Sequence, residues 1–137
     1  MSQLNVPVEE YTTPDPITAS ELTPVDDLLR LMKDNGIRHL PITRGEEVVG
    51  IISDRDVRLA LGLTAKEKLQ IVARDIMTED PVSVDSNATL DEVAFEMSQN
   101  KIGSVIVNDD SGNLLGIFTV TDALNALIEI ARENAPE

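Results

Sequence analysis

Apolar and polar residues follow a pattern that occurs twice along the chain. Between residues 25 and 32, and again between 90 and 97, apolar side chains recur at the i, i+3, i+4, i+7 spacing of a half-buried helix. Each predicted helix is preceded by a short apolar run, 17–19 or 82–84, which follows an Asp-Pro pair as a strand follows a turn. The pattern therefore predicts a strand and then a helix in each half of the chain.

Each half continues with two β-rich stretches joined by a turn, and then with a second helix. The turns are the segments RGEE and DDSGN, which carry residues typical of hairpin loops. The predicted strands are 37–43, 48–53, 102–108 and 114–119, and the predicted closing helices are 54–61 and 120 to about 134. The last helix places Leu124, Leu127, Ile128 and Ala131 on one face.

Residues at the predicted helix ends support these assignments. Thr23 before Pro24 is typical of an N-cap with proline at the first helical position. Thr89 with Glu92 three residues later predicts a capping box. The pair at 35–36, Asn-Gly, predicts a left-handed stop for the first helix.

The two halves form an internal repeat. A shift of 65 residues places YTTPDPIT on IMTEDPVS, and after one extra residue in the second turn a shift of 66 places Asp56 on Asp122. The expected organisation is a first repeat at 6–62, a connecting segment at 63–74 that can form a short helix, and a second repeat at 75–134. A repeat of about 50 residues cannot bury both faces of a sheet, so we expect the copies to pack together. The predicted fold class is α+β.

Composition excludes several functions. The 25 acidic and 11 basic residues give a net charge of −14, which disfavours nucleic-acid polymers and anionic membrane surfaces. Without cysteine, and with His39 as the one histidine, the chain lacks the usual nucleophile and metal-ligand sets. We therefore predict no catalytic residues, no metal site and no enzyme. The lack of a signal-like start and of a long apolar run predicts a cytoplasmic protein.

Candidate chemistry lies where the second strand of each hairpin meets the closing helix. Ser53 with Asp56, and Thr119 with Asp122, put hydroxyl and carboxylate groups beside the free N–H groups of a helix start. Such a site suits a phosphate, and a carboxylate there can accept hydrogen bonds from a ribose diol. Helix capping alone would produce the same pattern, and the two roles are compatible.

These repeated motifs resemble a tandem pair of CBS domains, the regulatory module named after cystathionine β-synthase. The matching stretches are VEEYTTPDPIT, NGIRHLPIT and VVGIISDRDV in the first copy, and RDIMTEDPVSV, NKIGSVIV and LLGIFTVTDAL in the second. The resemblance implies two βαββα units packed with pseudo-twofold symmetry, also known as a Bateman module, and two ligand clefts between them. It implies AMP, ADP or ATP as ligands, with S-adenosylmethionine or NAD as alternatives, and a homodimer formed through the helices. Whether Mg²⁺ accompanies the nucleotide is left open.

The resemblance also implies the residues of each cleft. The favoured first cleft comprises Arg38, His39, Ser53, Arg55, Asp56, Met77, Thr78, Val82, Ile102 and Gly103. The second comprises Thr12, Ile17, Ile37, Arg38, Ser104, Thr119, Thr121 and Asp122. We favour the first because Arg38, Arg44, Arg55 and Arg58 lie in the first copy, whereas residues 102–124 contain no basic residue. Thr12 stands where the second copy has Met77, which would loosen an adenine slot.

Two functions remain open. One is a sensor of adenosine nucleotides that regulates an unidentified protein in trans. The other is a dimerisation or scaffold module that binds no ligand. A metal-assisted hydrolase is disfavoured because no metal-binding spacing accompanies the many carboxylates.

Overall fold

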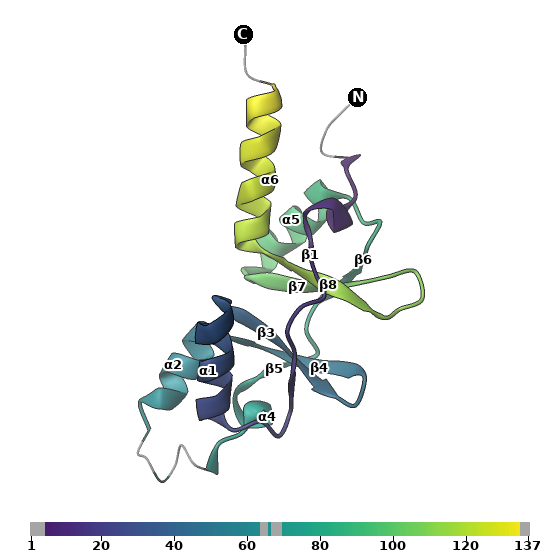
Figure 1. Ribbon diagram of the computed structural model, residues 1–137. Helices are drawn as coiled ribbons and strands as arrows, with labels where there is room; N and C mark the ends of the chain where they lie inside the picture. Colours follow the sequence, from purple (N-terminus) through teal and green to yellow (C-terminus); the bar gives the residue numbers. More distant parts are fainter. Residues whose placement is uncertain (1–4, 64–65, 67–69, 135–137) are drawn as a thin grey trace. The chain divides into compact units, whose positions relative to one another are not determined.

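The computed structural model describes residues 5–63, 66 and 70–134, and the chain divides into two compact units. The central unit is Ile17–Pro81, and the terminal unit combines Met1–Pro16 with Val82–Glu137 (Figure 1). The chain passes from one unit to the other at Pro16 and again at Pro81. The residue before each of these prolines, Asp15 or Asp80, has a positive φ of 46° or 49°.

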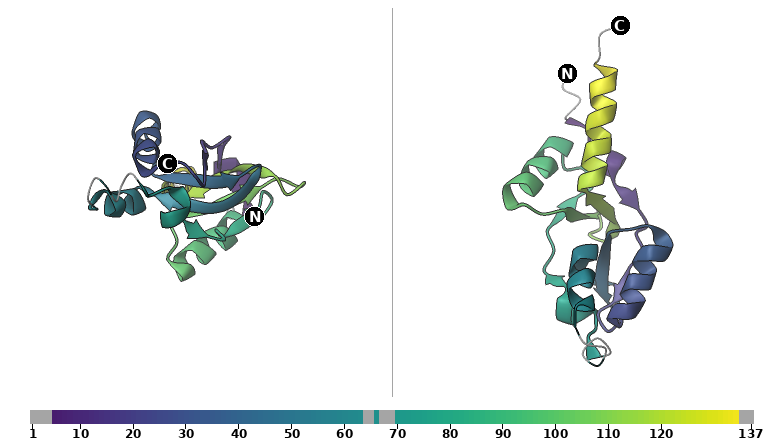
Figure 2. Two further views of the ribbon diagram at one scale, coloured as in Figure 1. Left: turned by 90° about the horizontal axis from the view of Figure 1, so that it is seen from below. Right: turned by 90° about the vertical axis from the view of Figure 1, so that its left-hand side faces the viewer.

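The central unit is a four-stranded sheet covered by two helices. The strand order is β2 (Ala19–Ser20), β3 (His39–Arg44), β4 (Glu47–Ser53) and β5 (Thr78–Glu79), with β2 parallel to β3 and the other pairs antiparallel. Helices α1 (Val25–Asn35) and α2 (Asp54–Leu61) contact each other, and a short helix α4 (Ala73–Ile76) precedes β5 (Figure 2). Leu28, Leu40, Ile42, Ile52 and Val57 are fully buried in its core.

The terminal unit repeats this arrangement with different loops. Its sheet has the order β1 (Thr13–Pro14), β8 (Leu114–Thr119), β7 (Ser104–Asn108) and β6 (Ser83–Asp85), with β6 parallel to β7. Its helices are α5 (Leu90–Asn100), α6 (Val120–Glu133) and the 3-10 turn η2 (Val8–Tyr11). Phe118 is fully buried among aliphatic side chains from η2, α5 and β7. The prediction of a mixed α+β protein with two repeats is confirmed.

The compact units cut across the sequence repeats. Residues 13–14, near the start of the chain, pair with the hairpin of the second copy, at Thr13↔Ile117 and Pro14↔Gly116. The equivalent β5 pairs with the hairpin of the first copy, at Ile51↔Thr78. Each hairpin thus gains a short antiparallel edge strand from the beginning of the other copy. In the connecting segment, residues 64–65 and 67–69 lie outside the described residues, so its predicted helix is not described there.

The helix ends confirm one expectation and correct two. Gly36 ends α1 with a φ of 61°, as Asn-Gly predicts. The N-cap of α1 is Pro24 rather than Thr23, and Thr89 makes no side-chain capping bond to α5. Both helix starts are satisfied by distant backbone instead, because the N–H of Val25 donates to Ile71 O at 3.1 Å and that of Leu90 donates to Val6 O at 2.8 Å.

The final helix presents its apolar face to the surroundings. Ala126 is the residue of α6 that is buried, whereas Leu124, Leu127 and Ile128 are 53%, 61% and 47% exposed. Ala131 is also exposed. We call Leu124, Leu127, Ile128 and Ala131 the α6 stripe. Within the described residues, no helix is both long and apolar enough to cross a bilayer.

Candidate functional site

The junction of β4 and α2 is the candidate site of the central unit. Ser53 is the N-cap of α2, and its hydroxyl accepts a hydrogen bond from the N–H of Asp56 at 3.2 Å. The Asp56 carboxylate accepts in return from the N–H of Ser53 at 2.9 Å. The capping role predicted for these residues is therefore confirmed. It leaves the N–H of Arg55, in the first turn, without a partner among the described residues.

Other predicted site residues converge on this junction. The carbonyl of Arg38 accepts from the N–H of Asp54 at 2.8 Å, and His39 faces Ser53 across the β3–β4 ladder. On the other side of β4, Thr78 pairs with Ile51. Strand pairing and capping thus bring together residues from three segments of the sequence.

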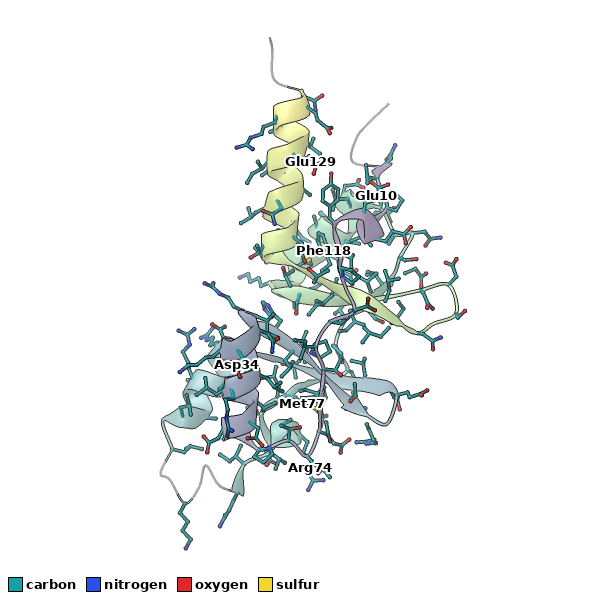
Figure 3. All side chains as sticks on the ribbon, in the orientation of Figure 1. Glu10, Asp34, Arg74, Met77, Phe118 and Glu129 are labelled. Atoms are coloured by element: carbon teal, nitrogen blue, oxygen red, sulfur yellow. The ribbon has the colours of Figure 1, made fainter. Side chains whose placement is uncertain are left out.

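Seven of the ten residues predicted for the first cleft lie in the central unit. Met77 is half-buried and rests against Gly50 of β4; Figure 3 labels it among the side chains of this unit. Arg38, Arg55 and Thr78 are exposed, whereas Ser53 and Asp56 are half-buried. Val82, Ile102 and Gly103 belong to the terminal unit, so their part in this site stays a prediction.

The terminal unit has an equivalent junction between β8 and α6. Thr119 accepts from the N–H of Asp122 at 3.3 Å, and Asp122 accepts from the N–H of Thr119 at 2.9 Å and from its hydroxyl at 3.1 Å. Ser104 pairs with Thr119 in the β7–β8 ladder, and Thr121 is exposed in the first turn of α6. Ile17, Ile37 and Arg38 belong to the central unit, so their assignment to the second cleft also stays a prediction.

One polar neighbour of Asp122 was missed by the sequence analysis. The hydroxyl of Thr13, on β1, donates to the two carboxylate oxygens of Asp122 at 3.3 and 3.5 Å. The shift of 65 residues places Thr13 on Thr78, which was predicted as a site residue, so the repeat held a signal that could have found it. No corresponding bond joins Thr78 to Asp56 in the described part of the chain.

The two carboxylates therefore differ in how much of their hydrogen-bonding capacity is used. Asp122 accepts bonds from Thr119 and Thr13, whereas Asp56 accepts, among the described residues, the N–H of Ser53 alone. A carboxylate has about four acceptor positions. Asp56 thus keeps more capacity for an incoming donor.

Thr12 occupies, in the terminal unit, the position that Met77 has in the central unit, and contacts within its own unit hold its side chain in place. Thr12 is buried, its hydroxyl donates to Val8 O at 2.8 Å, and its methyl group faces Gly116. It therefore packs against the unit's own backbone.

The arginines near the first site do not act as one group. Arg44 lies at the far end of β3 from Arg38, about 20 Å along an extended strand. Its guanidinium donates to Glu21 at 2.5 Å, and this hydrogen bond, with the charge of Glu21, raises the pKa of Arg44 further above its ordinary value. Arg44 is therefore not part of the positive environment that the sequence analysis assigned to this site. Arg58 pairs with Asp54 at 3.6 Å, and Arg38 has no ion-pair partner among the described residues.

The described residues contain no group of three or more His, Asp or Glu side chains arranged to hold a metal ion.

The acidic residues of the terminal unit affect the pKa of one nearby side chain, that of Tyr11. Tyr11 of η2 lies near Glu129 and Glu133 of α6 and near Glu10, and Figure 3 shows Glu10 and Glu129 on these adjoining elements. Burial and then these negative charges raise the pKa of Tyr11 above 10.

Comparison with known proteins identifies several relatives. An inosine-5'-monophosphate dehydrogenase of Korarchaeum cryptofilum is 36% identical over 114 residues, which cover 83% of this chain and 23% of that enzyme. A CBS domain-containing protein of Dictyostelium discoideum is 28% identical, with 98% of this chain and 99% of that protein covered. For four of the first five curated relatives, the matched segment spans less than half of the relative's length.

Solved structures show the same fold. CBSX2, a CBS-pair protein of Arabidopsis thaliana whose complex with AMP has been solved, matches with a TM-score of 0.79 and 27% identity over 93% of this chain and 99% of that one. The CBS domain pair of protein MJ0100, in complex with 5'-methylthioadenosine and S-adenosyl-L-methionine, matches with a TM-score of 0.80 and 28% identity over 91% of this chain and 98% of that one.

The CBS domain model matches this chain twice, over residues 8–63 and 73–129. Each match contains one hairpin and one capped strand–helix junction. The chain therefore belongs to the CBS domain family, as a tandem CBS pair.

Proposed function

We propose that this protein binds an adenosine nucleotide at the β4–α2 junction and, by doing so, regulates a partner protein in trans. The observation that carries the proposal is the Asp56 carboxylate, which among the described residues accepts only the N–H of Ser53 and lies at the same helix start as the N–H of Arg55, for which the described residues offer no acceptor. Asp56 would accept hydrogen bonds from the ribose diol. Arg38 and the N–H groups at the start of α2 would contact the phosphate, where the helix dipole favours negative charge.

The ligands of two relatives support an adenosine ligand. CBSX2 is described in complex with AMP. MJ0100 is described in complex with 5'-methylthioadenosine, which is a thioether, and S-adenosyl-L-methionine, which is a sulfonium compound. What these ligands share is the adenosine group, and they differ in charge at the 5' position. The cations near Asp56 favour AMP, ADP or ATP over S-adenosylmethionine, which carries a positive sulfonium centre.

The β8–α6 junction is the weaker candidate. Its carboxylate is already bonded by Thr13 and Thr119, and the terminal unit offers no arginine or lysine between residues 102 and 124. We propose that it holds a less anionic ligand or none. Mg²⁺ would be brought by the nucleotide if it is present, since no acidic cluster in the described residues supplies a site for it.

The first prediction is that AMP, ADP or ATP raises the unfolding temperature of the protein in a concentration-dependent way. A ligand at 100 times its Kd adds about 2.7 kcal/mol to the free energy of unfolding. Thermal unfolding with each nucleotide, with and without Mg²⁺, and with S-adenosylmethionine and NAD, measures the effect. Calorimetric titration then gives the number of sites. If none of these compounds stabilises the protein at millimolar concentration, the scaffold function replaces the sensor.

We also propose that the protein forms a homodimer through its helices, with the α6 stripe in the interface. The stripe places four apolar side chains at i, i+3, i+4 and i+7, the spacing at which one helix packs against another. Its acidic neighbours Glu129 and Glu133 lie near Tyr11 of η2. The stripe is therefore a surface of this acidic protein where a second copy meets little repulsion.

The second prediction concerns this interface. We expect Leu127→Glu to shift the protein from dimer to monomer, because a carboxylate would be buried between apolar side chains. Light scattering coupled to size-exclusion chromatography measures the mass. Asn125→Glu adds the same charge to an exposed position of the same helix and should leave the dimer intact. A monomeric wild-type protein, or equal effects of the two variants, would contradict this interface.

A further inference from the structure

Thr13 is the residue through which the N-terminal part of the chain reaches the β8–α6 junction. Strand β1 pairs with β8 at Thr13↔Ile117, and the N–H of Asp15 donates to Leu115 O at 3.2 Å. These backbone contacts hold Thr13 beside the start of α6. Its hydroxyl donates to Oδ1 and Oδ2 of Asp122 at 3.3 and 3.5 Å. The carboxylate of Asp122 therefore has an internal partner from a distant part of the sequence.

A count of hydrogen-bond donors shows what this contact does to the carboxylate. Asp122 receives one hydrogen from the N–H of Thr119, one from the hydroxyl of Thr119 and one from the hydroxyl of Thr13. A carboxylate offers about four acceptor positions, so about one is left. A ribose diol brings two hydroxyl donors and needs two positions. Asp56 has room for both, because among the described residues it receives only the N–H of Ser53.

The central unit shows that the fold does not force this contact. Thr78 occupies the same position on β5 and pairs with Ile51, as Thr13 pairs with Ile117. No hydrogen bond joins Thr78 to Asp56 in the part of the chain that the structure describes. The same residue type at the same place in the fold thus leaves one carboxylate open and occupies the other.

The difference follows from the residue that precedes each threonine. Met77 places its side chain against Gly50, and a Cβ atom at Gly50 would lie 3.0 Å from the nearest backbone atom of β5. The terminal unit has Thr12 instead, and a Cβ atom at Gly116 would lie closer than that to the backbone of β1. The smaller side chain lets β1 approach β8 more closely at this position. The hydroxyl of the next residue therefore comes within reach of the carboxylate.

We propose that the hydroxyl of Thr13 closes the β8–α6 junction to ribose and so confines nucleotide binding to the β4–α2 junction. The inference rests on the function proposed above, because it takes a ribose diol as the group that these carboxylates bind. It makes Thr13 the residue that determines how many ligands one chain holds. Without this hydroxyl, Asp122 keeps about two acceptor positions, which match the two donors of a ribose.

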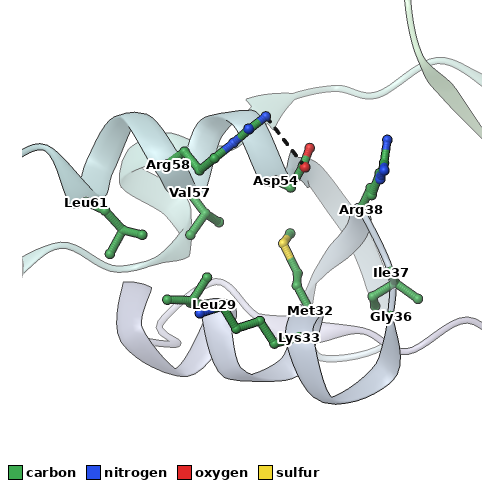
Figure 4. A pocket seen from close by; sticks show the side chains of 10 residues that line it. All are labelled: Leu29, Met32, Lys33, Gly36, Ile37, Arg38, Asp54, Val57, Arg58 and Leu61. Carbon is green, nitrogen blue, oxygen red and sulfur yellow. Dashed lines mark ion pairs between the residues drawn. The ribbon is translucent and has the colours of Figure 1, made fainter.

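Adenosine is the probe for this proposal, because the two junctions differ in charge. Arg38, Arg58 and Asp54 line a cavity of about 510 Å³ between α1 and α2, and Figure 4 shows the two arginines on either side of Asp54 at the start of α2. Residues 102–124 of the terminal unit contain no lysine or arginine. A neutral nucleoside therefore tests the ribose contact without a phosphate, for which this segment supplies no cation.

Calorimetric titrations with adenosine are made on full-length chains that carry Asp56→Ala, so that the β8–α6 junction alone retains its carboxylate. Thr13→Val removes the hydroxyl and keeps the branched shape of the side chain. We expect it to tighten adenosine binding about tenfold, which corresponds to about 1.4 kcal/mol, because one more ribose hydroxyl can donate to a charged acceptor. The amide NMR signals of Thr119 and Asp122 should then shift on binding. Thr13→Ser keeps the hydroxyl and is the matched control, so it should leave adenosine binding as it is with Asp56→Ala alone.

Adding Asp122→Ala to the Thr13→Val chain should remove the gain, because the ribose then has no carboxylate to bind. The proposal is overturned if Thr13→Val and Thr13→Ser give equal adenosine binding, including the case in which neither chain binds it. It is also overturned if the gain survives Asp122→Ala. These results do not depend on the β4–α2 junction, which Asp56→Ala disables in every chain. A failure of the proposed nucleotide site appears instead as AMP binding to the wild type that is absent or that Asp56→Ala leaves unchanged.

Discussion

Replacing Gly116 with alanine is expected to destabilise the terminal unit by about 2–3 kcal/mol, as overpacking of a tight contact does. A Cβ atom at Gly116 would meet the carbonyl oxygen of Thr13 at less than any normal contact distance, and it would lie 2.6 Å from Thr12 Cγ2 and 3.0 Å from the carbonyl carbon of Thr13. These atoms belong to β1, which pairs with β8 at this position. The strand must move away, so its pairing with β8 is lost.

Gly50 supplies the matched control because it occupies the same position in the first copy. A Cβ atom there would meet the sulfur of Met77 and lie 2.8 Å from its Cγ, with the nearest backbone atom, Thr78 O, at 3.0 Å. Methionine has three rotatable side-chain bonds and adapts to a new neighbour. We therefore expect Gly50→Ala to cost clearly less than Gly116→Ala in urea unfolding followed by circular dichroism. Equal losses would show that the edge strand of the terminal unit yields as readily as a methionine side chain.

The second large effect is expected on ligand binding. Asp56→Ala should lower the affinity for AMP by one to two orders of magnitude, because each hydrogen bond from the ribose to a carboxylate contributes about 1.5–3 kcal/mol. Asp122→Ala should lower it much less, since Thr13 and Thr119 already occupy that carboxylate. Calorimetric titration of both variants with AMP measures the difference.

Asp56→Ala and Asp122→Ala serve as controls for each other because we expect them to lower the free energy of unfolding by similar amounts. Each removes a carboxylate that accepts from an N-cap N–H group at 2.9 Å, so each should cost about 1 kcal/mol of helix stability. Asp56→Asn retains an oxygen that can accept from Ser53 while it removes the charge, and it therefore separates capping from ligand binding. If Asp122→Ala impairs AMP binding as much as Asp56→Ala, or more, our ranking of the two junctions is wrong.

Much of the candidate site could be predicted because its residues are close in sequence. Ser53 and Asp56 are three residues apart at a strand–helix junction, and their capping box depends only on local backbone geometry. The same holds for Thr119 and Asp122. Arg38 and His39 could be placed beside Ser53 because a short turn joins β3 to β4 and thus determines which residues pair.

Other parts of the site depend on contacts between distant segments. The bond from Thr13 to Asp122 joins residues 109 positions apart, and it forms because β1 pairs with β8. The far position of Arg44 follows from the length of β3, and its pairing with Glu21 follows from the packing of β2 against β3. No local pattern indicated these contacts.

The sequence alone therefore determined the repeat, the helices and hairpins, and the two capped junctions, because each depends on side-chain periodicity or on neighbours a few residues away. The tertiary structure decided which edge strand completes each sheet, which carboxylate keeps free acceptor capacity, and where α1 and α2 leave a cavity. It also decided that α6 buries Ala126 and exposes Leu124 and Leu127. The physical reason is that an apolar face specifies burial but not the partner that provides it, and the partner is chosen by long-range packing.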